Sequence, residues 1–152
     1  MKIYLATDHA GFELKEKIQN FLKTQNYEVA DCGAFSFDKN DDYPDYVSKA
    51  SEKVSNDSEN SMGIIFGKSG MGEEIVANKF RNVRCAFGFS EENVKLSREH
   101  NNANILSLGS EFIDFEQAKK LVDIFLKTSF SGEERHIRRL NKIKEIEQKN
   151  YV

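Results

Sequence analysis

The chain has 152 residues, which suits one domain with a single core. Hydrophobic residues at 39% and charged residues at 31%, with only 9 Gly and 1 Pro, argue against a disordered or fibrous protein. The net charge of -3 provides no strongly basic face for a nucleic-acid backbone. We therefore expect one globular domain, residues 1–152, that binds no nucleic acid.

The first residues and the cysteines indicate where the protein works. Residues 2–7 form a strand-like run without the apolar stretch of a signal peptide, and no segment approaches the roughly 20 apolar residues of a membrane span. Cys32 and Cys85 are far apart and form neither a C-x-x-C pair nor a disulfide framework. We expect a cytoplasmic protein that does not bind a membrane.

Short apolar runs alternate with helical patterns along the whole chain. This alternation is typical of a parallel sheet with helices on both faces, and it predicts the α/β class. The runs that we expect to form five strands cover residues 2–7, 27–32, 63–66, 83–87 and 105–108. Apolar residues at helical spacing predict core-facing helices around residues 12–22 and 115–126.

Three further helices are indicated by local signals. Pro44 suits the first turn of a helix, and Ser90 before two glutamates is typical of an N-cap with acids in the first turn. The last segment, residues 133–151, places four apolar residues on one side of a helix: Ile137, Leu140, Ile143 and Ile146. Because no strand follows it, we expect this helix to contact a partner subunit.

Reactive side chains follow several of the predicted strands. In an open parallel sheet, ligands bind outside the carboxyl ends of the strands, so these turns are the first place to look for a site. Asp8 and His9 follow the first strand, and a glycine-rich loop, residues 67–72, follows the third and leads into a helix that begins near Glu73. His100 comes after the fourth strand and its helix.

The glycine-rich loop reads Gly67-Lys68-Ser69-Gly70-Met71-Gly72 and offers backbone N–H groups to an anion. A Walker A reading fails, because only three residues separate Gly63 from Gly67 where that motif needs four, and they belong to a strand. A dinucleotide fingerprint fails too, because the loop runs G-x-x-G-x-G and follows the third strand. The remaining interpretation is that the backbone N–H groups of this loop bind a smaller oxyanion or a reacting sugar.

Each candidate residue also has a purely structural explanation. Glu73 is favoured in the first turn of any helix, and a cationic His100 stabilises a helix end. Arg135 and Arg139 lie four residues apart, so they share a helix face that is either solvated or able to clamp one phosphate. The chain has no recognisable metal-ligand motif, and we expect neither a metal nor a cofactor.

Six motifs follow one another along the chain: Asp8-His9-Ala10-Gly11, Asp42-Tyr43-Pro44, the glycine-rich loop with Glu73, Ala77-Asn78-Lys79, Arg98-Glu99-His100-Asn101-Asn102-Ala103-Asn104 and Arg135-His136. Together they resemble the type B ribose-5-phosphate isomerases and their lactose-pathway galactose-6-phosphate isomerase relatives, in order from Met1 to about Glu147. The resemblance implies a three-layer, Rossmann-like or flavodoxin-like α/β/α fold. It also implies a homodimer with shared active sites that interconverts ribose 5-phosphate and ribulose 5-phosphate, a step of the pentose phosphate pathway, through an enediolate.

The resemblance further implies a role for each residue. Members carry the catalytic base either as a cysteine at the end of the third strand, where this chain has Phe66, or as a glutamate after the glycine loop, so Glu73 is the implied base. Other implied catalytic residues are Ser69, Asp8 and, from the partner subunit, His100. The implied substrate contacts are His9, Tyr43, Gly67, Lys68, Gly70, Met71, Gly72, Asn101, Arg135 and Arg139, of which His9 and the two arginines would bind the phosphate.

Alternatives stay open at this point. Ribose isomerases of the family often carry an arginine where this chain has Glu111, so a 6-phosphohexose such as galactose 6-phosphate or allose 6-phosphate is a second candidate substrate. Against the lactose-pathway alternative, one of its subunits lacks the histidine that His9 supplies. A non-catalytic sugar-phosphate sensor is the other class, although it would have no need for Glu73. The pairing of dimers into tetramers also stays open.

Overall fold

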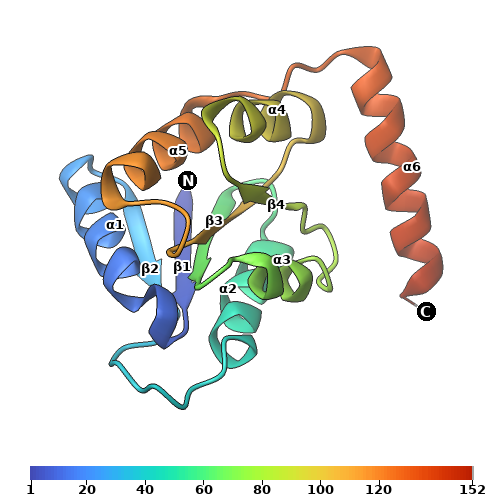
Figure 1. Ribbon diagram of the computed structural model, residues 1–152. Coiled ribbons are helices and arrows are strands. Elements are labelled where there is room, and N and C mark those ends of the chain that lie inside the picture. Colours follow the sequence, from blue (N-terminus) through green and yellow to red (C-terminus); the bar gives the residue numbers. More distant parts are fainter. Residues whose placement is uncertain (152) are drawn as a thin grey trace.

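The structure is a computed structural model and describes residues 1–151. Five parallel strands form one sheet in the order β2-β1-β3-β5-β4 (Figure 1). The strands are β1 (Lys2–Thr7), β2 (Glu28–Asp31), β3 (Ser61–Gly67), β4 (Cys85–Gly88) and β5 (Ile105–Gly109). The helices are α1 (Phe12–Thr24), α2 (Pro44–Asn56), α3 (Met71–Ala77), α4 (Glu91–Asn101), α5 (Phe115–Lys127) and α6 (Glu134–Asn150), with a 3-10 turn, η1 (His9–Gly11). The predicted α/β class with five parallel strands is confirmed.

The helices cover both faces of the sheet and make three layers. Successive strand residues point to opposite faces, so Ile64 and Phe66 of β3 pack with α1, α4 and α5, while Ile65 packs with α2 and α3. All three side chains are completely buried. Burial of each contributes about 1.5–3 kcal/mol, so the sheet is held from both sides. Figure 1 shows these two helical layers with the sheet between them.

Local signals explain where the helices begin. Pro44 is the first residue of α2, and Ser90 caps α4 in a capping box with Asn93. The helix predicted near Glu73 begins two residues earlier, at Met71, because Gly70 adopts a left-handed φ of 79° just before it. Within residues 1–151, no helix combines the length and apolar character needed to cross a bilayer.

A buried lysine fixes the segment that leaves β2. Lys15 of α1 is completely buried, and its Nζ donates to both carboxylate oxygens of Asp31, at 2.7 and 2.6 Å, and to the Ala34 carbonyl at 2.7 Å. A buried ammonium is costly unless it is paired, and these three contacts satisfy its three donors. The chain beyond Ala34 is thereby anchored before it runs across the carboxyl edge of the sheet towards α2.

Candidate active site

The carboxyl ends of β1 and β3 form the candidate site. The chain leaves β1 for β2 on one side and later returns to β3 on the other, so the segments after these two neighbouring strands diverge, and a ligand crevice is expected at this switch point. Asp8 and His9 follow β1 directly, and the glycine-rich loop follows β3. The topology therefore brings together two of the segments that the sequence singles out.

Glu73 is buried at this switch point, beside the end of β3. It is the third residue of α3, is only 3% exposed, and points its carboxylate back at Gly67, at the end of β3. Burial raises the pKa of the Glu73 carboxyl, the nearby Asp8 charge raises it further, and a hydrogen bond with its own backbone acts in the opposite direction. A carboxylate held out of water is a stronger base than an exposed one, as removal of a proton from carbon requires.

Gly67 makes room for that carboxylate. A Cβ atom at position 67 would lie 1.8 Å from Glu73 Oε1. By contrast, the Phe66 side chain is completely buried in the core on the α1 and α5 side. Position 66, where the resemblance implies a cysteine base in other members, therefore holds a core side chain here, and position 67 faces the carboxylate.

We expect Gly67→Ala to lower kcat by about 10²-fold, because the added methyl group pushes the Glu73 carboxylate aside and a displacement of about 1 Å is enough for such a loss. Steady-state kinetics on a variant whose melting temperature shows that it is folded would check this. A folded variant with the wild-type kcat would mean that the carboxylate position observed here is not the working one.

Ser69 and Tyr43 flank the same helix start. Ser69 Oγ accepts from the Met71 amide at 3.3 Å, and the Gly70 carbonyl accepts from Ser107 Oγ at 2.6 Å, which ties the loop to β5. A Cβ atom at Gly72 would lie 2.6 Å from the Tyr43 ring, so this glycine lets Tyr43 approach α3. Lys68 and Met71 are exposed beside them. The predicted glycine-loop residues and Tyr43 thus share one region.

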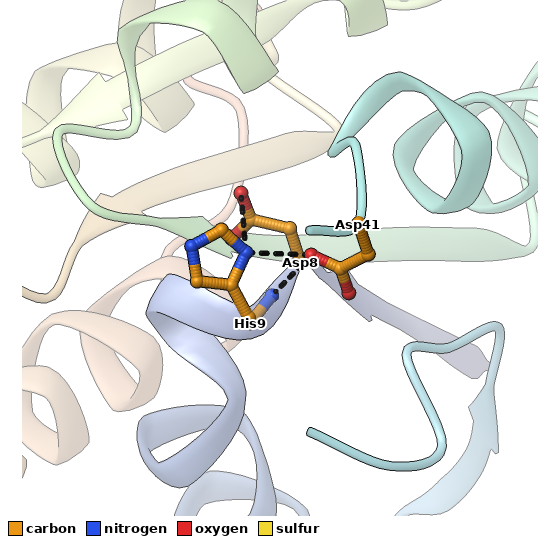
Figure 2. Close-up of side chains that lie close together, drawn as sticks. All are labelled: Asp8, His9 and Asp41. Carbon is orange, nitrogen blue, oxygen red and sulfur yellow. Dashed lines mark hydrogen bonds and ion pairs between the residues drawn. The ribbon is translucent and has the colours of Figure 1, made fainter. Parts of the chain in front are cut away.

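Asp8, His9 and Asp41 lie close together, with hydrogen bonds between His9 and Asp41 and an ion-pair contact of 3.9 Å between His9 and Asp8 (Figure 2). Asp8 caps η1 by accepting from the Ala10 amide at 2.9 Å. His9 donates to Asp41 Oδ1 twice, from its backbone amide at 2.9 Å and from its ring Nδ1 at 2.6 Å. The hydrogen bond that the His9 ring donates to Asp41 is the main cause that raises the pKa of His9; burial lowers this pKa, and the charge of Asp8 raises it. Asp41 was not among the predicted site residues.

The same three residues are the cluster best suited to a cation among the described residues. Their ligand atoms lie within 4.8 Å of one another. However, two ligands on one zinc ion, each about 2.0–2.2 Å from it, stand more than about 3 Å apart. The 2.6 Å between His9 Nδ1 and Asp41 Oδ1 is a direct hydrogen-bond distance. We therefore interpret the pair as a histidine held by a carboxylate.

His100 and Asn101 do not join this crevice. They close α4, and β5 begins only four residues after Asn101, so they lie at the amino edge of the sheet, opposite Asp8 and Glu73. The His100 ring stacks on His136 of α6 with centroids 4.2 Å apart. His136 was not predicted; it is 3% exposed, and its Nε2 is buried without a hydrogen-bond partner in the described part of the chain. Burial lowers the pKa of His136.

The two predicted phosphate-binding arginines lie on α6, beyond this amino edge. Arg135 and Arg139 are exposed, and Arg135 Nε pairs with Glu133 at 2.9 Å. Helix α6 runs along the β4 side of the molecule, outside the three layers (Figure 1). Within one chain, therefore, the predicted residues form two separate groups.

The cysteines take no part in either group. Cys85 is buried in β4, where burial raises the pKa of its thiol, and burial likewise raises the pKa of Cys32. A thiol that resists ionisation is a poor base, because the thiolate is the reactive form. Glu73 is therefore the group in the crevice that is suited to accept a proton from carbon.

Comparisons with known proteins find relatives along nearly the whole chain. A family model described as ribose/galactose isomerase matches residues 3–143. Ribose-5-phosphate isomerase B of Mycolicibacterium paratuberculosis is 43% identical over 148 residues, 97% of this chain and 92% of the relative.

Solved structures of related enzymes have the same fold. The structure of ribose-5-phosphate isomerase B from Mycoplasma genitalium with bound ribulose-5-phosphate has a TM-score of 0.94 and 41% identity, covering 97% of this chain and 96% of the other. That of the Clostridium thermocellum enzyme has a TM-score of 0.93 at 41% identity and covers 99% of both chains. Matched along nearly its whole length in sequence and in structure, this chain belongs to the ribose/galactose isomerase family.

Proposed function

We propose that this chain is a single-domain aldose-ketose isomerase that interconverts ribose 5-phosphate and ribulose 5-phosphate through an enediolate. The observation that carries the proposal is the buried Glu73 carboxylate, which faces Gly67 at the end of β3 and has a raised pKa. The relatives named ribose-5-phosphate isomerase B, one of them solved with bound ribulose-5-phosphate, support this choice of substrate.

Glu73 would act on the open-chain sugar. It takes the proton from C2, the C2–H electron pair becomes the C1–C2 double bond of the enediolate, and the C1=O π pair moves onto O1. The hydroxyl proton passes from O2 to O1, the carbonyl re-forms at C2, and the same carboxylic acid returns a proton to C1. Ser69 and the amides of the glycine loop lie beside it and would donate to the enediolate oxygens as charge develops there. Loss of one such donor costs about 3 kcal/mol in comparable oxyanion holes. Since these groups carry out both steps, we assign no metal and no cofactor to the reaction.

We propose that the complete site is shared between the subunits of a homodimer. His100 and Asn101 lie at the opposite edge of the sheet from Glu73, so a single chain offers them no route to its own crevice. A partner subunit would supply them for ring opening, together with Arg135 and Arg139 for the phosphate, while Asp8 and Tyr43 contact the sugar. The apolar side of α6, where Ile143 and Ile146 are 49% and 59% exposed, supports contact with a partner.

A 6-phosphohexose is the second candidate substrate. The Glu111 amide donates to the Lys68 carbonyl at 3.0 Å, which places this residue beside the glycine loop. Its carboxylate would stand where many ribose isomerases of the family carry an arginine.

A cytoplasmic location is also part of the proposal, supported by the free state of both cysteines.

We expect the purified protein to convert ribose 5-phosphate with a higher kcat/KM than allose 6-phosphate or galactose 6-phosphate. A ketose-specific assay of the three sugars side by side would measure this. Turnover confined to a 6-phosphohexose would make that sugar the substrate. Binding of ribose 5-phosphate without turnover would instead support a sensor and overturn the isomerase proposal.

A further inference from the structure

Asp41 holds His9 from a segment distant in the sequence. It lies 32 residues further along the chain, in the stretch that crosses the carboxyl edge before α2. One oxygen, Oδ1, accepts from both the amide and the ring of His9, and the Asp41 side chain is 5% exposed. Because both its backbone amide and its ring are hydrogen-bonded to the same oxygen, the His9 side chain has little freedom to rotate.

The second carboxylate oxygen of Asp41, Oδ2, indicates that this side chain needs a positive charge beside it. Asp41 Oδ2 is buried and has no hydrogen-bond partner among the described residues. A buried carboxylate is costly unless an opposite charge lies beside it, and His9 is the basic side chain that it contacts. The protonated imidazolium is therefore the form of His9 that this carboxylate stabilises.

The geometry also decides which ring nitrogen is free. Nδ1 points at Asp41, so Nε2 lies on the far side of the ring, as Figure 2 shows. The His9 side chain is 32% exposed, and no hydrogen bond among residues 1–151 occupies Nε2. A protonated Nε2–H on this open side can donate to an anion.

We propose that Asp41 is a positioning residue that holds His9 as an imidazolium with its Nε2–H directed at the phosphate of the substrate. The phosphate as the target rests on the proposed function, whereas the hold of Asp41 on His9 does not. Asp41 itself touches no reacting atom; it acts through the charge and orientation of His9.

The charges around His9 agree with this role. Asp8, 3.9 Å from the ring at the end of β1, and Asp38 and Asp41 in the segment before α2 all raise the pKa of His9. Because the pKa is raised, His9 stays protonated to a higher pH than a free histidine. Phosphate binding through His9 should therefore persist to a higher pH than binding through a free histidine and weaken as the pH rises through the pKa of His9.

Asp41→Asn tests the proposal, because the amide oxygen still accepts from the His9 backbone but no longer pairs with a cation. The chain has only 3 histidines, so proton NMR resolves each ring, and the signal of His9 is identified by its loss in His9→Asn. We expect the pKa of His9 to fall in Asp41→Asn, while the signals of His100 and His136 keep their shifts and report an intact fold.

Asp38→Asn is the matched control. It removes the same charge from the same segment, but Asp38 acts on His9 only through space, so the titration of His9 should move far less. With ribose 5-phosphate, KM of Asp41→Asn should rise about tenfold at a pH between the two pKa values of His9 that the NMR titrations give for variant and wild type, as expected for one lost charge-assisted hydrogen bond. Below both pKa values it should approach the wild-type value, because His9 is then protonated in both proteins.

An unchanged titration of His9 in Asp41→Asn would overturn the proposal, as would a KM raised equally at every pH, which would indicate a structural role alone. A wild-type chain that converts no sugar phosphate would overturn the proposed function instead. The NMR titration contains no substrate, so it would still decide whether Asp41 holds His9 as a cation.

Discussion

Glu73→Gln should lower kcat for ribose 5-phosphate by about 10³-fold or more, while leaving sugar-phosphate binding within an order of magnitude. The amide keeps the shape of the side chain against Gly67 but cannot accept the C2 proton. A loss of that size corresponds to about 4 kcal/mol of transition-state stabilisation. Steady-state kinetics, combined with calorimetric binding of ribose 5-phosphate to the variant, would measure both quantities.

The pH dependence and stability of this variant follow from the same burial. Because the folded protein raises the pKa of Glu73, it binds that proton more tightly than the unfolded chain, and the ionised carboxylate disfavours folding as the pH rises through the raised value. Glu73→Gln removes that charge, so its melting temperature at neutral pH should equal or exceed that of the wild type. In the wild type, kcat should fall as the pH drops through the pKa of Glu73.

Glu74→Gln is the matched control for the base. Glu74 is the next residue of the same helix and is half-buried, but its side chain does not face Gly67. We expect near-normal kcat from this variant. Near-normal turnover by Glu73→Gln itself would rule out Glu73 as the base.

Mixing Glu73→Gln and His100→Ala homodimers should restore activity although each parent is inactive. The two residues lie at opposite edges of the sheet, so the shared-site proposal gives each heterodimer one site with both residues intact and one with neither. Random pairing makes about half of the dimers heterodimers, and half of their sites work. Recovery should approach about a quarter of the wild-type activity, measured after subunit exchange.

The matched control is a mixture of Glu73→Gln with Gly67→Ala. Residues 67 and 73 are in contact within one chain, so each shared site takes both of them from the same subunit. Every site in that heterodimer therefore contains one of the two substitutions, and activity should not recover. An affinity tag on one parent shows that exchange has taken place. If exchange is complete and the Glu73→Gln and His100→Ala mixture stays inactive, both residues serve one chain's own site and the shared-site proposal is wrong.

The fold was predictable because its signals are local. Residues 2–7 form β1 as expected, since apolar runs that are buried on both faces stand out in any sequence. The predicted strand 83–87 begins later, at Cys85, because the Arg84 amide bonds the Asn104 side chain at 2.8 Å and not a neighbouring strand. A hydrogen bond between segments 20 residues apart leaves no trace in the local pattern.

The composition of the site was only partly predictable. Glu73 and the glycine loop follow β3 in sequence, so the rule for parallel sheets finds them. Asp41 belongs to the most polar loop, but nothing in that loop indicates which of its acids meets His9. His136 belongs to one of the motifs that carry the resemblance, but that motif gives it no role, and its stacking on His100 depends on how α6 packs against α4.

The most direct test of proton transfer by Glu73 is isomerisation of ribose 5-phosphate in D2O, followed by proton NMR. The wild-type chain should incorporate solvent deuterium at C2 of ribose 5-phosphate and at C1 of ribulose 5-phosphate over repeated turnovers, because the abstracted proton exchanges while the carboxyl group holds it. Glu73→Gln should incorporate none. Ribulose 5-phosphate formed by the wild type without deuterium in either sugar would contradict an enediolate and indicate a direct hydride shift.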